Sequence, residues 1–486
     1  MNFSFIDYLI IAIYLIGVTL SGIIIAGKQK TSRDYFLGGK EMSWWSVGFS
    51  IVASETSTLT FISIPGLAYK SNMHFLQIAI GYFIGRLLVS IIFIPAYYKG
   101  DLETAYDFIG RRFGISLRKF ASSIFIITRV LASGVRLFAT AIPLHFVTGF
   151  DYVTCILMIG IFTLIYTYIG GLKAVVAMDV VQLFIYLSGA IISMVIILNH
   201  FPNGLNDVIH FATLNINKFE IFSFNFGNSF YDFFLSPYTL FGGLLGGTFL
   251  TMASHGTDQL LVQRLLGCKT KFESQKALML DALLIVIQFA FFLFLGLCLF
   301  AFYDGVEFQK LGLTSSDEIF PKFIVENLPI GIKGIVIAGV LASAMGTLSS
   351  AISSLASSTY LDLFKTENRS NEIFWSKIFT LIWGIILIFG ATLFTDTKNP
   401  VVEIGLKIAS ITYGGLLGTF FLGLFFKNTN QIDAFIGFIF GLLSMGCVLL
   451  FTKIDFTWHT LIGTCVTIIV GNISSLIKIK TKNAVS

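Results

Sequence analysis

The chain has 486 residues, of which 55% are hydrophobic and only 12% are charged, and its formal net charge is +5. With a mean hydropathy of +0.85, it carries more apolar surface than a soluble domain of this size could bury. The composition excludes the soluble class and predicts an all-α polytopic protein in a lipid bilayer. The small positive charge indicates asymmetry between loops rather than a nucleic-acid site.

Apolar runs of about 20 residues, the length that crosses a bilayer as a helix, follow one another along the whole chain. About thirteen of them are present, and we number the first span 0 and the others spans 1 to 12. They cover residues 5–27, 44–69, 74–98, 118–147, 152–170, 175–199, 236–256, 277–303, 331–360, 376–396, 403–426, 432–452 and 457–478.

Lysine and arginine are concentrated in alternate loops between these spans, beginning with GKQKTSRD after span 0. The intervening loops, among them 200–235 and 304–330, are longer and poorer in these residues. By the positive-inside rule, the amino terminus is expected outside and the carboxyl terminus in the cytoplasm, which requires an odd number of spans. We expect a plasma (inner) membrane protein, with short surface helices in loops 99–117 and 200–235.

The centre of span 1 is polar, since it reads SETSTLT from Ser54 to Thr60 and includes the acid Glu55. Hydroxyl groups in membrane helices commonly bond to their own backbone or to a neighbouring helix. Polar residues on all sides of one helix cannot face one partner, however. The pattern therefore predicts a locally unwound segment whose free carbonyl groups line a buried aqueous site, as in transporters that bind Na⁺.

Span 8 contains a second hydroxyl-rich stretch, in which Thr347, Ser350 and Ser354 recur at three- and four-residue spacing. The stretch is typical either of close helix packing by small residues or of a site for a hard cation. Span 5 carries the acid Asp179 near its start. An intramembrane carboxylate favours a second cation site, although Asp179 could instead cap span 5 or pair with Lys173 at the inner face.

Four stretches resemble the sodium:solute symporter family: SETSTLTFISIPGLAY, YTYIGGLKAVVAMDVVQ, TDQLLVQR and ASAMGTLSSAISS. The resemblance extends over the chain and implies a single transporter domain, 1–486, with the inverted five-helix repeat of the leucine transporter. Spans 1–5 (44–199) would form the first repeat and spans 6–10 (236–426) the second, with 5–27 and 432–478 as peripheral spans. The glycine-rich FGGLLGGTF in span 6 would match the break in span 1.

The resemblance also implies the sodium ligands. The common site would take the carbonyl groups of span 1 and residues of span 8, namely Ala53, Thr56, Ser343, Gly346 and Thr347. Many relatives have a hydroxyl residue where this chain has Gly346, so that one ligand is missing or replaced. A second sodium site, found in some members, would use Asp179, Thr347, Ser349 and Ser350.

By family position, the substrate site would be lined by Glu55, Ser57, Thr60, Gln77 and Tyr413. Three arginines within spans 2 and 3 are unusual, because an unpaired arginine is costly inside a membrane. These arginines are Arg86, Arg129 and Arg136. In one interpretation they form internal ion pairs or reach an interface, and in the other one of them holds a substrate carboxylate. The sequence leaves both interpretations open.

These observations predict a sodium-coupled symporter that imports a sugar, sialic acid, carboxylate or amino acid by alternating access. The alternatives are a solute channel and a transporter-derived sensor without coupled transport. No enzyme motif lies where it could form an active site. The five cysteines and six histidines show no metal-ligand spacing. We therefore expect no cofactor and no metal except sodium, with the solute, Na⁺ and the lipid bilayer as partners of a functional monomer.

Overall fold

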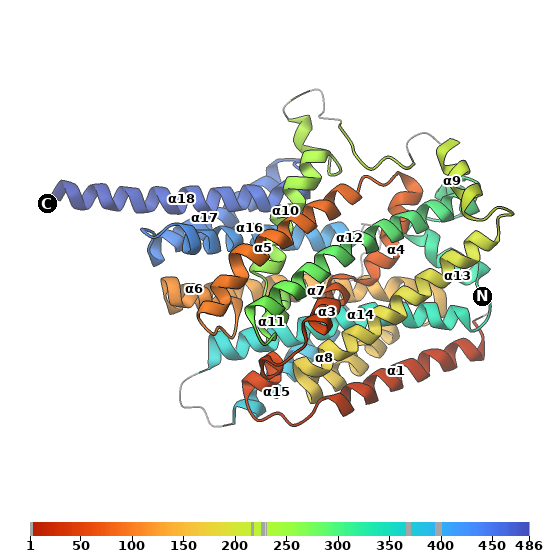
Figure 1. Ribbon diagram of the computed structural model, residues 1–486, viewed down its shortest axis with the longest axis horizontal. Helices are drawn as coiled ribbons and strands as arrows, with labels where there is room; N and C mark the ends of the chain where they lie inside the picture. The colour runs from red at the N-terminus through yellow and green to blue at the C-terminus, as the bar shows by residue number, and fades with distance from the viewer. Residues whose placement is uncertain are drawn as a thin grey trace.

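The computed structural model describes residues 3–214, 218–224, 229, 231–365, 371–393 and 401–485, and every regular element in these ranges is a helix. Figure 1 shows the two ends of the chain at opposite ends of the long axis of the molecule. Helix α9 lies toward the amino-terminal end and α6 toward the carboxyl-terminal end. These are the short surface helices predicted in loops 200–235 and 99–117.

Several helices in the first part of the chain begin at polar capping residues. Side chains such as Ser4, Thr31, Thr104 and Asp151 accept backbone N–H groups at these starts. The helices are α1 (Phe5–Ile25), α2 (Ser32–Leu37), η1 (Gly38–Lys40), α3 (Trp44–Glu55), α4 (Thr58–Lys70), α5 (Leu76–Lys99), α6 (Ala105–Phe113), α7 (Ile115–Thr148), α8 (Tyr152–Asn199) and α9 (Leu205–Leu214).

The second part of the chain is built in the same way, with Thr270 and Asn430 as side-chain caps. Its helices are η2 (Asp232–Phe234), η3 (Gly242–Gly246), α10 (Gly247–Gly256), α11 (Gln259–Leu266), α12 (Lys271–Phe302), η4 (Phe308–Leu311), η5 (Ser316–Glu318), α13 (Ile319–Asn327), α14 (Ile332–Ser358), η6 (Thr359–Phe364), α15 (Glu372–Ala391), α16 (Val401–Phe425), α17 (Gln431–Phe451) and α18 (Phe456–Val485).

Within the described ranges, nine helices are long and apolar enough to cross a bilayer, and the bent pair α3–α4 makes a tenth candidate. Helix α8 has 48 residues, which at 1.5 Å per residue is about 72 Å, more than twice the hydrocarbon thickness. It turns at Gly171, where φ is +56°, so it contains two spans, as predicted for 152–170 and 175–199. The count of thirteen remains a prediction.

The two breaks expected in spans 1 and 6 take different forms. Helices α3 and α4 meet at an angle of 60°, which is the predicted unwound segment of span 1. In span 6 the chain does not unwind at its glycines; Gly242–Gly246 form a single π-helical stretch, η3. Helix α5 packs closely on it, because a Cβ atom at Gly81 would lie 2.3 Å from the carbonyl oxygen of Gly243.

Helix α14 is the central element of the fold, and every residue from 336 to 358 is buried. Its polar side chains and backbone join the surrounding helices by hydrogen bonds. Ser350 bonds to Ser54 of α3 (3.0 Å), and the Tyr166 hydroxyl of α8 donates to the carbonyl of Met345 (3.3 Å). The hydroxyl-rich stretch of span 8 is therefore buried inside the protein.

Candidate functional site

The polar centre of span 1 interrupts the backbone hydrogen bonds of the helix pair. The Thr56 N–H donates to the Val52 carbonyl (2.9 Å), and the ladder resumes where the Thr60 N–H donates to the Ser57 carbonyl (2.9 Å). Thr56 and Ser57 have extended backbone conformations. The carbonyl groups from Ala53 to Thr56 thus lie between the two ladders, where they are available to a cation.

Helix α14 faces this break. The Thr58 and Ser343 hydroxyl groups are hydrogen-bonded across the junction (2.9 Å). Beside Ser343 is a void of about 10 Å³, about the space that one water molecule needs. Three of the residues predicted to bind sodium share this void; its lining is Ala53, Thr56, Gln182, Leu183, Tyr186, Ala342 and Ser343.

The remaining span 8 candidates lie on neighbouring turns of α14. The Thr347 hydroxyl donates to the Ser343 carbonyl (3.0 Å), and Thr347 lines a second small void together with Ser57 and Arg136. The Ser349 hydroxyl donates to the carbonyl of Gly346 (3.0 Å). Thr347 therefore lies between the possible ion site and a larger cavity described below.

Asp179, the acid of span 5, is fully buried and lies among hydroxyl groups and an arginine. Its Oδ2 atom accepts hydrogen bonds from Ser50 and from the Arg264 guanidinium (2.9 Å). The same guanidinium donates to the Ser350 hydroxyl and to Ser50. The structure brings Asp179 and Ser350 together as predicted, but it adds a protein cation between them.

Sequence reasoning missed Arg264, although it belongs to the motif TDQLLVQR, where a charged residue follows an apolar turn. Asp179 is paired with this arginine and not with Lys173, whose amino group lies 3.9 Å from Glu41. Burial explains why Asp179 pairs with Arg264 and not with Lys173. Arg264 and Asp179 are both fully buried, whereas Glu41, the partner of Lys173, is largely exposed. A buried carboxylate without a partner would be strongly destabilising.

A cavity of about 180 Å³ lies on the other side of the α3–α4 break. Its polar lining comes from α3, α4, α5, α7, α10 and α16, and its apolar lining includes Phe75, Leu250, Ile285 and Phe289. Most of the residues predicted to bind substrate line it: Glu55, Ser57, Thr60, Arg129, Arg136 and Tyr413.

Two predicted substrate residues lie elsewhere. Gln77 is fully buried, donates to the Tyr238 carbonyl (3.1 Å) and accepts the Ser223 N–H (3.1 Å). It therefore connects α5 to the segment before α10 and does not reach the cavity. Arg86 is also fully buried and is absent from the cavity lining.

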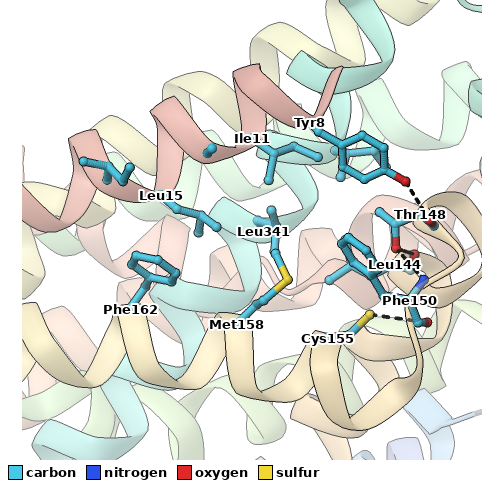
Figure 2. Close-up of a pocket in the computed structure, with 13 residues that line it drawn as sticks. Tyr8, Ile11, Leu15, Leu144, Thr148, Phe150, Cys155, Met158, Phe162 and Leu341 are labelled. Atoms are coloured by element: carbon cyan, nitrogen blue, oxygen red, sulfur yellow. Dashed lines mark hydrogen bonds between the residues drawn. The ribbon is translucent and has the colours of Figure 1, made fainter. Parts of the chain in front are cut away.

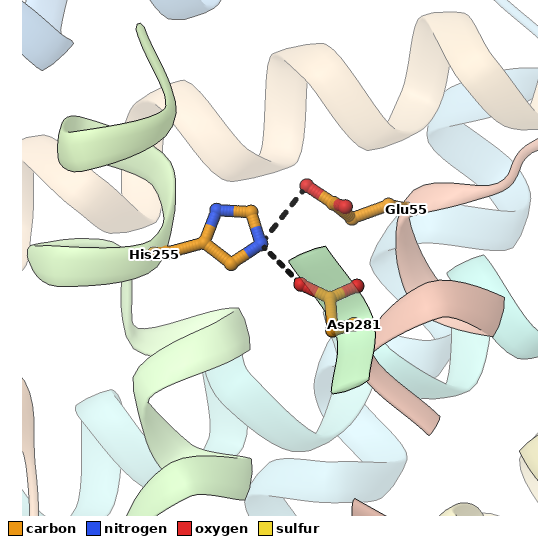
Figure 3. Close-up of side chains that lie close together, drawn as sticks. All are labelled: Glu55, His255 and Asp281. Atoms are coloured by element: carbon orange, nitrogen blue, oxygen red, sulfur yellow. Dashed lines mark ion pairs between the residues drawn. The ribbon is translucent and has the colours of Figure 1, made fainter. Parts of the chain in front are cut away.

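Arg86 forms an ion-pair network that explains its position in the membrane. Its guanidinium contacts Glu55 through Nη2 and Asp281 through Nε (2.5 Å). Figure 3 shows His255 pointing at both acids, with Nε2 at 3.1 Å from Glu55 and 3.5 Å from Asp281. His255 carries no signal in the sequence, because its acid partners Glu55 and Asp281 lie on two other helices.

Glu55, His255 and Asp281 resemble a metal site, since one ligand atom from each lies within 4.8 Å of the others. The Arg86 guanidinium already occupies both carboxylates. Arg86 and His255 together contact three of the four carboxylate oxygen atoms, so a divalent cation would have to displace a basic side chain. We therefore interpret the cluster as a structural ion-pair network.

Arg129 also has internal partners. Its Nη2 contacts Asp258, and the Tyr413 hydroxyl donates to the same carboxylate (2.8 Å). The three side chains come from α7, the α10–α11 junction and α16, so they join three helices at one wall of the cavity. Asp258 is the second residue of the motif TDQLLVQR, but its pairing with Arg129 could not be predicted from the sequence.

Arg136 differs from the other two arginines. It lines the cavity and the adjoining void, and among the described residues its guanidinium takes part in no ion pair and no side-chain hydrogen bond. Arg129 and Arg136 lie seven residues apart on one face of α7. Of the three arginines, Arg136 is thus the one whose charge is left for a ligand.

Comparison with known proteins identifies the family. The family model described as "Sodium:solute symporter family" matches residues 35–441. The chain belongs to the sodium:solute symporter family. It is accordingly a sodium-coupled solute symporter, and the resemblance drawn from its four motifs is confirmed.

Relatives match along the length of the chain. The sodium/sialic acid symporter SiaT of Proteus mirabilis is 27% identical, with 98% of this chain and 95% of the relative covered. The sodium-coupled monocarboxylate transporter 1 of Xenopus laevis is 30% identical, with 90% and 71% covered. Both relatives are named as sodium-coupled transporters of organic acids.

Solved structures confirm the fold class. A substrate-bound, outward-open structure of a Na⁺-coupled sialic acid symporter has a TM-score of 0.85 at 26% identity, and 98% of each chain is covered. The nucleobase-cation symporter Mhp1, in a closed conformation, has a TM-score of 0.55 at 12% identity, with 92% and 94% covered. The latter likeness concerns the fold alone.

Proposed function

We propose that the solute is a small organic anion whose carboxylate is bound by Arg136. The observation that supports this choice is the contrast among the three intramembrane arginines. Arg86 and Arg129 are neutralised by acids of the protein, whereas Arg136 lines the cavity without such a partner among the described residues.

The physical argument is electrostatic. An arginine at membrane depth without a counter-ion is unfavourable, and a carboxylate can satisfy its planar fork with two parallel hydrogen bonds. Hydroxyl groups of Ser57, Thr60, Ser63 and Ser254 are within the lining to bind the rest of the solute. The acids named for the sialic acid and monocarboxylate relatives have the same carboxylate group.

We further propose two sodium ions per cycle, one at the Ala53–Thr56–Ser343 void and one at Asp179. One charge moved through 100 mV contributes about 2.3 kcal/mol, and a tenfold sodium gradient adds about 1.4 kcal/mol per ion. Two ions with a monovalent anion carry one net charge. The total of about 5 kcal/mol would support accumulation of the anion by a few thousandfold.

The topology belongs to the same proposal. We assign 44–199 and 236–426 to the two inverted repeats, the amino terminus to the outside and the carboxyl terminus to the cytoplasm of a plasma membrane. The positions of the chain ends and of α6 and α9 in Figure 1 support opposite sides for the termini. The basic loops that flank α6 support the inner side for this helix.

The experiment compares acids with neutral analogues of the same shape in proteoliposomes. Lactate against lactamide, and N-acetylneuraminic acid against its methyl ester, are tested in counterflow and in thermal shift with Na⁺ or choline. At least one of the two acids should be transported, and the neutral analogue of that acid should not be. Arg136→Gln should weaken binding of the acid by at least about tenfold, because one charge-assisted pair is lost.

Two controls accompany the experiment. Arg111→Gln removes an arginine that lies at the surface on α6, and should leave solute binding unchanged. Arg136→Lys keeps the charge but not the fork and should be intermediate. Equal transport of an acid and its neutral analogue, or an Arg136→Gln protein that binds acids normally, would reject the assignment.

A further inference from the structure

A groove of about 610 Å³ lies where the last turns of α5 and α16 meet the surface helix α6. Ile91 of α5 and Phe425 of α16 line it and are 60% and 57% exposed, so the groove opens toward the lipid. It shares no lining residue with the solute cavity. The function proposed above therefore leaves this groove without a role.

The groove has an apolar end and a basic end. On α5, Ile92, Pro95, Ala96 and Lys99 line it at three- and four-residue spacing, which places them on one face of the helix. Lys99 is the last residue of α5, and Ile91 lies about 12 Å before it along the helix axis. Apolar side chains therefore line the groove at bilayer depth, and the lysine lies where the helix leaves the bilayer.

The protein uses the charge of the basic end only in part. Lys99 is exposed and takes part in no ion pair and no side-chain hydrogen bond among the described residues. Arg111 of α6 donates to the Gly100 carbonyl and lies 3.4 Å from Asp107, but Asp107 is held more closely by Arg118, at 2.6 Å. The residues that line the groove include no acid. The basic end is therefore suited to an anion.

Helix α6 is fixed against α16, which gives the groove a defined shape. The Arg112 guanidinium donates to the carbonyl groups of Phe426 and Thr429 (3.0 and 3.1 Å), just beyond the end of α16. A Cβ atom at Gly423 would lie 3.0 Å from the Phe108 ring, so α6 packs closely on α16. The walls formed by α5 and α16 belong to different proposed repeats, and a ligand in the groove would contact both.

A second hollow, of about 230 Å³ between α1, α7, α8 and α14, lacks such a basic end. Figure 2 shows that its polar groups are already used by the protein. The Tyr8 hydroxyl donates to the Thr148 carbonyl (3.0 Å), and the Cys155 thiol lies 3.9 Å from the Phe150 carbonyl oxygen. This hollow offers an apolar surface to any lipid chain and nothing that selects a headgroup. Only the groove at α6 combines both features among these two.

We propose that the groove binds an anionic phospholipid of the cytoplasmic leaflet, with its phosphate between Lys99 and Arg111 and an acyl chain along Ile92 and Ala96. Basic pockets between membrane helices at the cytoplasmic side are typical sites for anionic headgroups. A zwitterionic lipid carries the same phosphate, but its own cation cancels the charge. The inference goes beyond the proposed function, and only the choice of leaflet depends on the proposed topology.

The test adds lipid to the purified, delipidated full-length protein in a non-ionic detergent. Phosphatidylglycerol and phosphatidylcholine with the same acyl chains are compared; native mass spectrometry counts the bound lipid, and thermal shift gives a second readout. Phosphatidylglycerol should bind at least about tenfold more tightly. Lys99→Gln and Arg111→Gln should each weaken its binding by about fivefold and leave that of phosphatidylcholine unchanged.

Lys28→Gln is the matched control, because it removes an exposed lysine of the basic loop after α1, outside the groove. It should bind phosphatidylglycerol like the unmodified protein, and Lys99→Arg, which keeps the charge, should retain most of the binding. Ala96→Trp fills the apolar part of the groove without changing its charge and should weaken binding. If Ala96→Trp fails to fold, Ala96→Leu is measured in the same way.

Inorganic phosphate distinguishes a lipid site from a site for the free anion. At the concentration of the lipid, it should neither displace phosphatidylglycerol nor stabilise the protein, because it makes no contact with the apolar part of the groove. Phosphatidylglycerol displaced by inorganic phosphate, or bound normally when position 96 is enlarged, would show that no acyl chain is held there and would overturn the inference.

Two further results would overturn it: equal affinity for the two lipids, or an unchanged preference for phosphatidylglycerol in the Lys99→Gln, Arg111→Gln double variant. The latter would mean that the lipid follows the charge of the whole inner face. Failure of the proposed function looks different, because it would appear as normal binding of acids by Arg136→Gln. The lipid-site variants should bind the solute like the unmodified protein.

Discussion

Two buried ion-pair clusters flank the break between α3 and α4, and they use their acids differently. In the Glu55 cluster, Arg86 and His255 both contact the acids Glu55 and Asp281, so two basic side chains face two carboxylates. In the Asp179 cluster, Arg264 contacts one oxygen and the other has no partner among the described residues. Asp281 Oδ1 in the first cluster also has no hydrogen-bond partner among the described residues, but its acids face two basic side chains, and we call this cluster closed. We call the second cluster open, because the free Oδ1 atom of Asp179 lies near the oxygen atoms of Gln182 and Ala53 at Gly346.

The difference separates a structural role from a transport role. A buried acid whose contacts are all protein groups holds helices together, and its loss should affect folding. A buried acid with a free oxygen beside other oxygens is poised for a cation that comes and goes. A third acid, Asp258, is paired with Arg129 and Tyr413 and resembles the first kind.

The largest effect is expected from breaking the closed cluster. Arg86→Met would leave Glu55 and Asp281 buried without their main counter-ion, and should lower the free energy of unfolding by about 3–5 kcal/mol. The measurement is thermal or denaturant unfolding in detergent. Arg111→Met, at an exposed position, is the control. A fully stable Arg86→Met protein would show that this cluster is not structural.

The next effect concerns the open cluster. Asp179→Asn removes the charge that an ion and Arg264 share, and should lower the Hill coefficient for Na⁺ from near two toward one, with a loss of affinity of about tenfold or more. Because Arg264 also loses its counter-ion, some loss of stability is expected as well. Reversal potentials of solute flux give the stoichiometry. If the stoichiometry is unchanged, Asp179 is only a partner of Arg264.

A smaller effect is expected at Thr347, which lies between the ion void and the cavity. Thr347→Ala should raise the Na⁺ concentration for half-maximal uptake by about tenfold, since one ligand is lost. Ser354→Ala is the matched control, because this hydroxyl group donates to the Ala351 carbonyl of its own helix. Wild-type sodium dependence in Thr347→Ala would exclude Thr347 as a ligand.

The smallest effect is expected at the third acid. Tyr413→Phe removes one hydrogen bond to Asp258 and leaves the Arg129 pair in place, at a cost of about 1 kcal/mol. Because Tyr413 also lines the cavity, solute affinity should change by no more than about fivefold, with Na⁺ affinity unchanged. Equilibrium binding of labelled solute measures this. A loss as large as that in Arg136→Gln would place Tyr413 among the main solute contacts.

The sequence by itself determined the membrane class, most of the spans and the break in span 1. These are local properties: hydropathy over about 20 residues decides whether a helix can enter a bilayer, and a run of polar residues decides where it cannot continue unchanged. It also selected Arg136 and Asp179 as residues of interest, because charge within an apolar run is costly wherever the chain folds.

The tertiary structure decided which of these residues remain available to ligands. Each helical residue turns about 100° from the last, so the residue type does not show which neighbour a side chain meets. Gln77 bonds to the Tyr238 carbonyl rather than facing the cavity, and Asp179 meets Arg264, 85 residues away. Such partners come together only when the helices pack, and within the described residues packing leaves the Arg136 guanidinium without an acid in an ion pair.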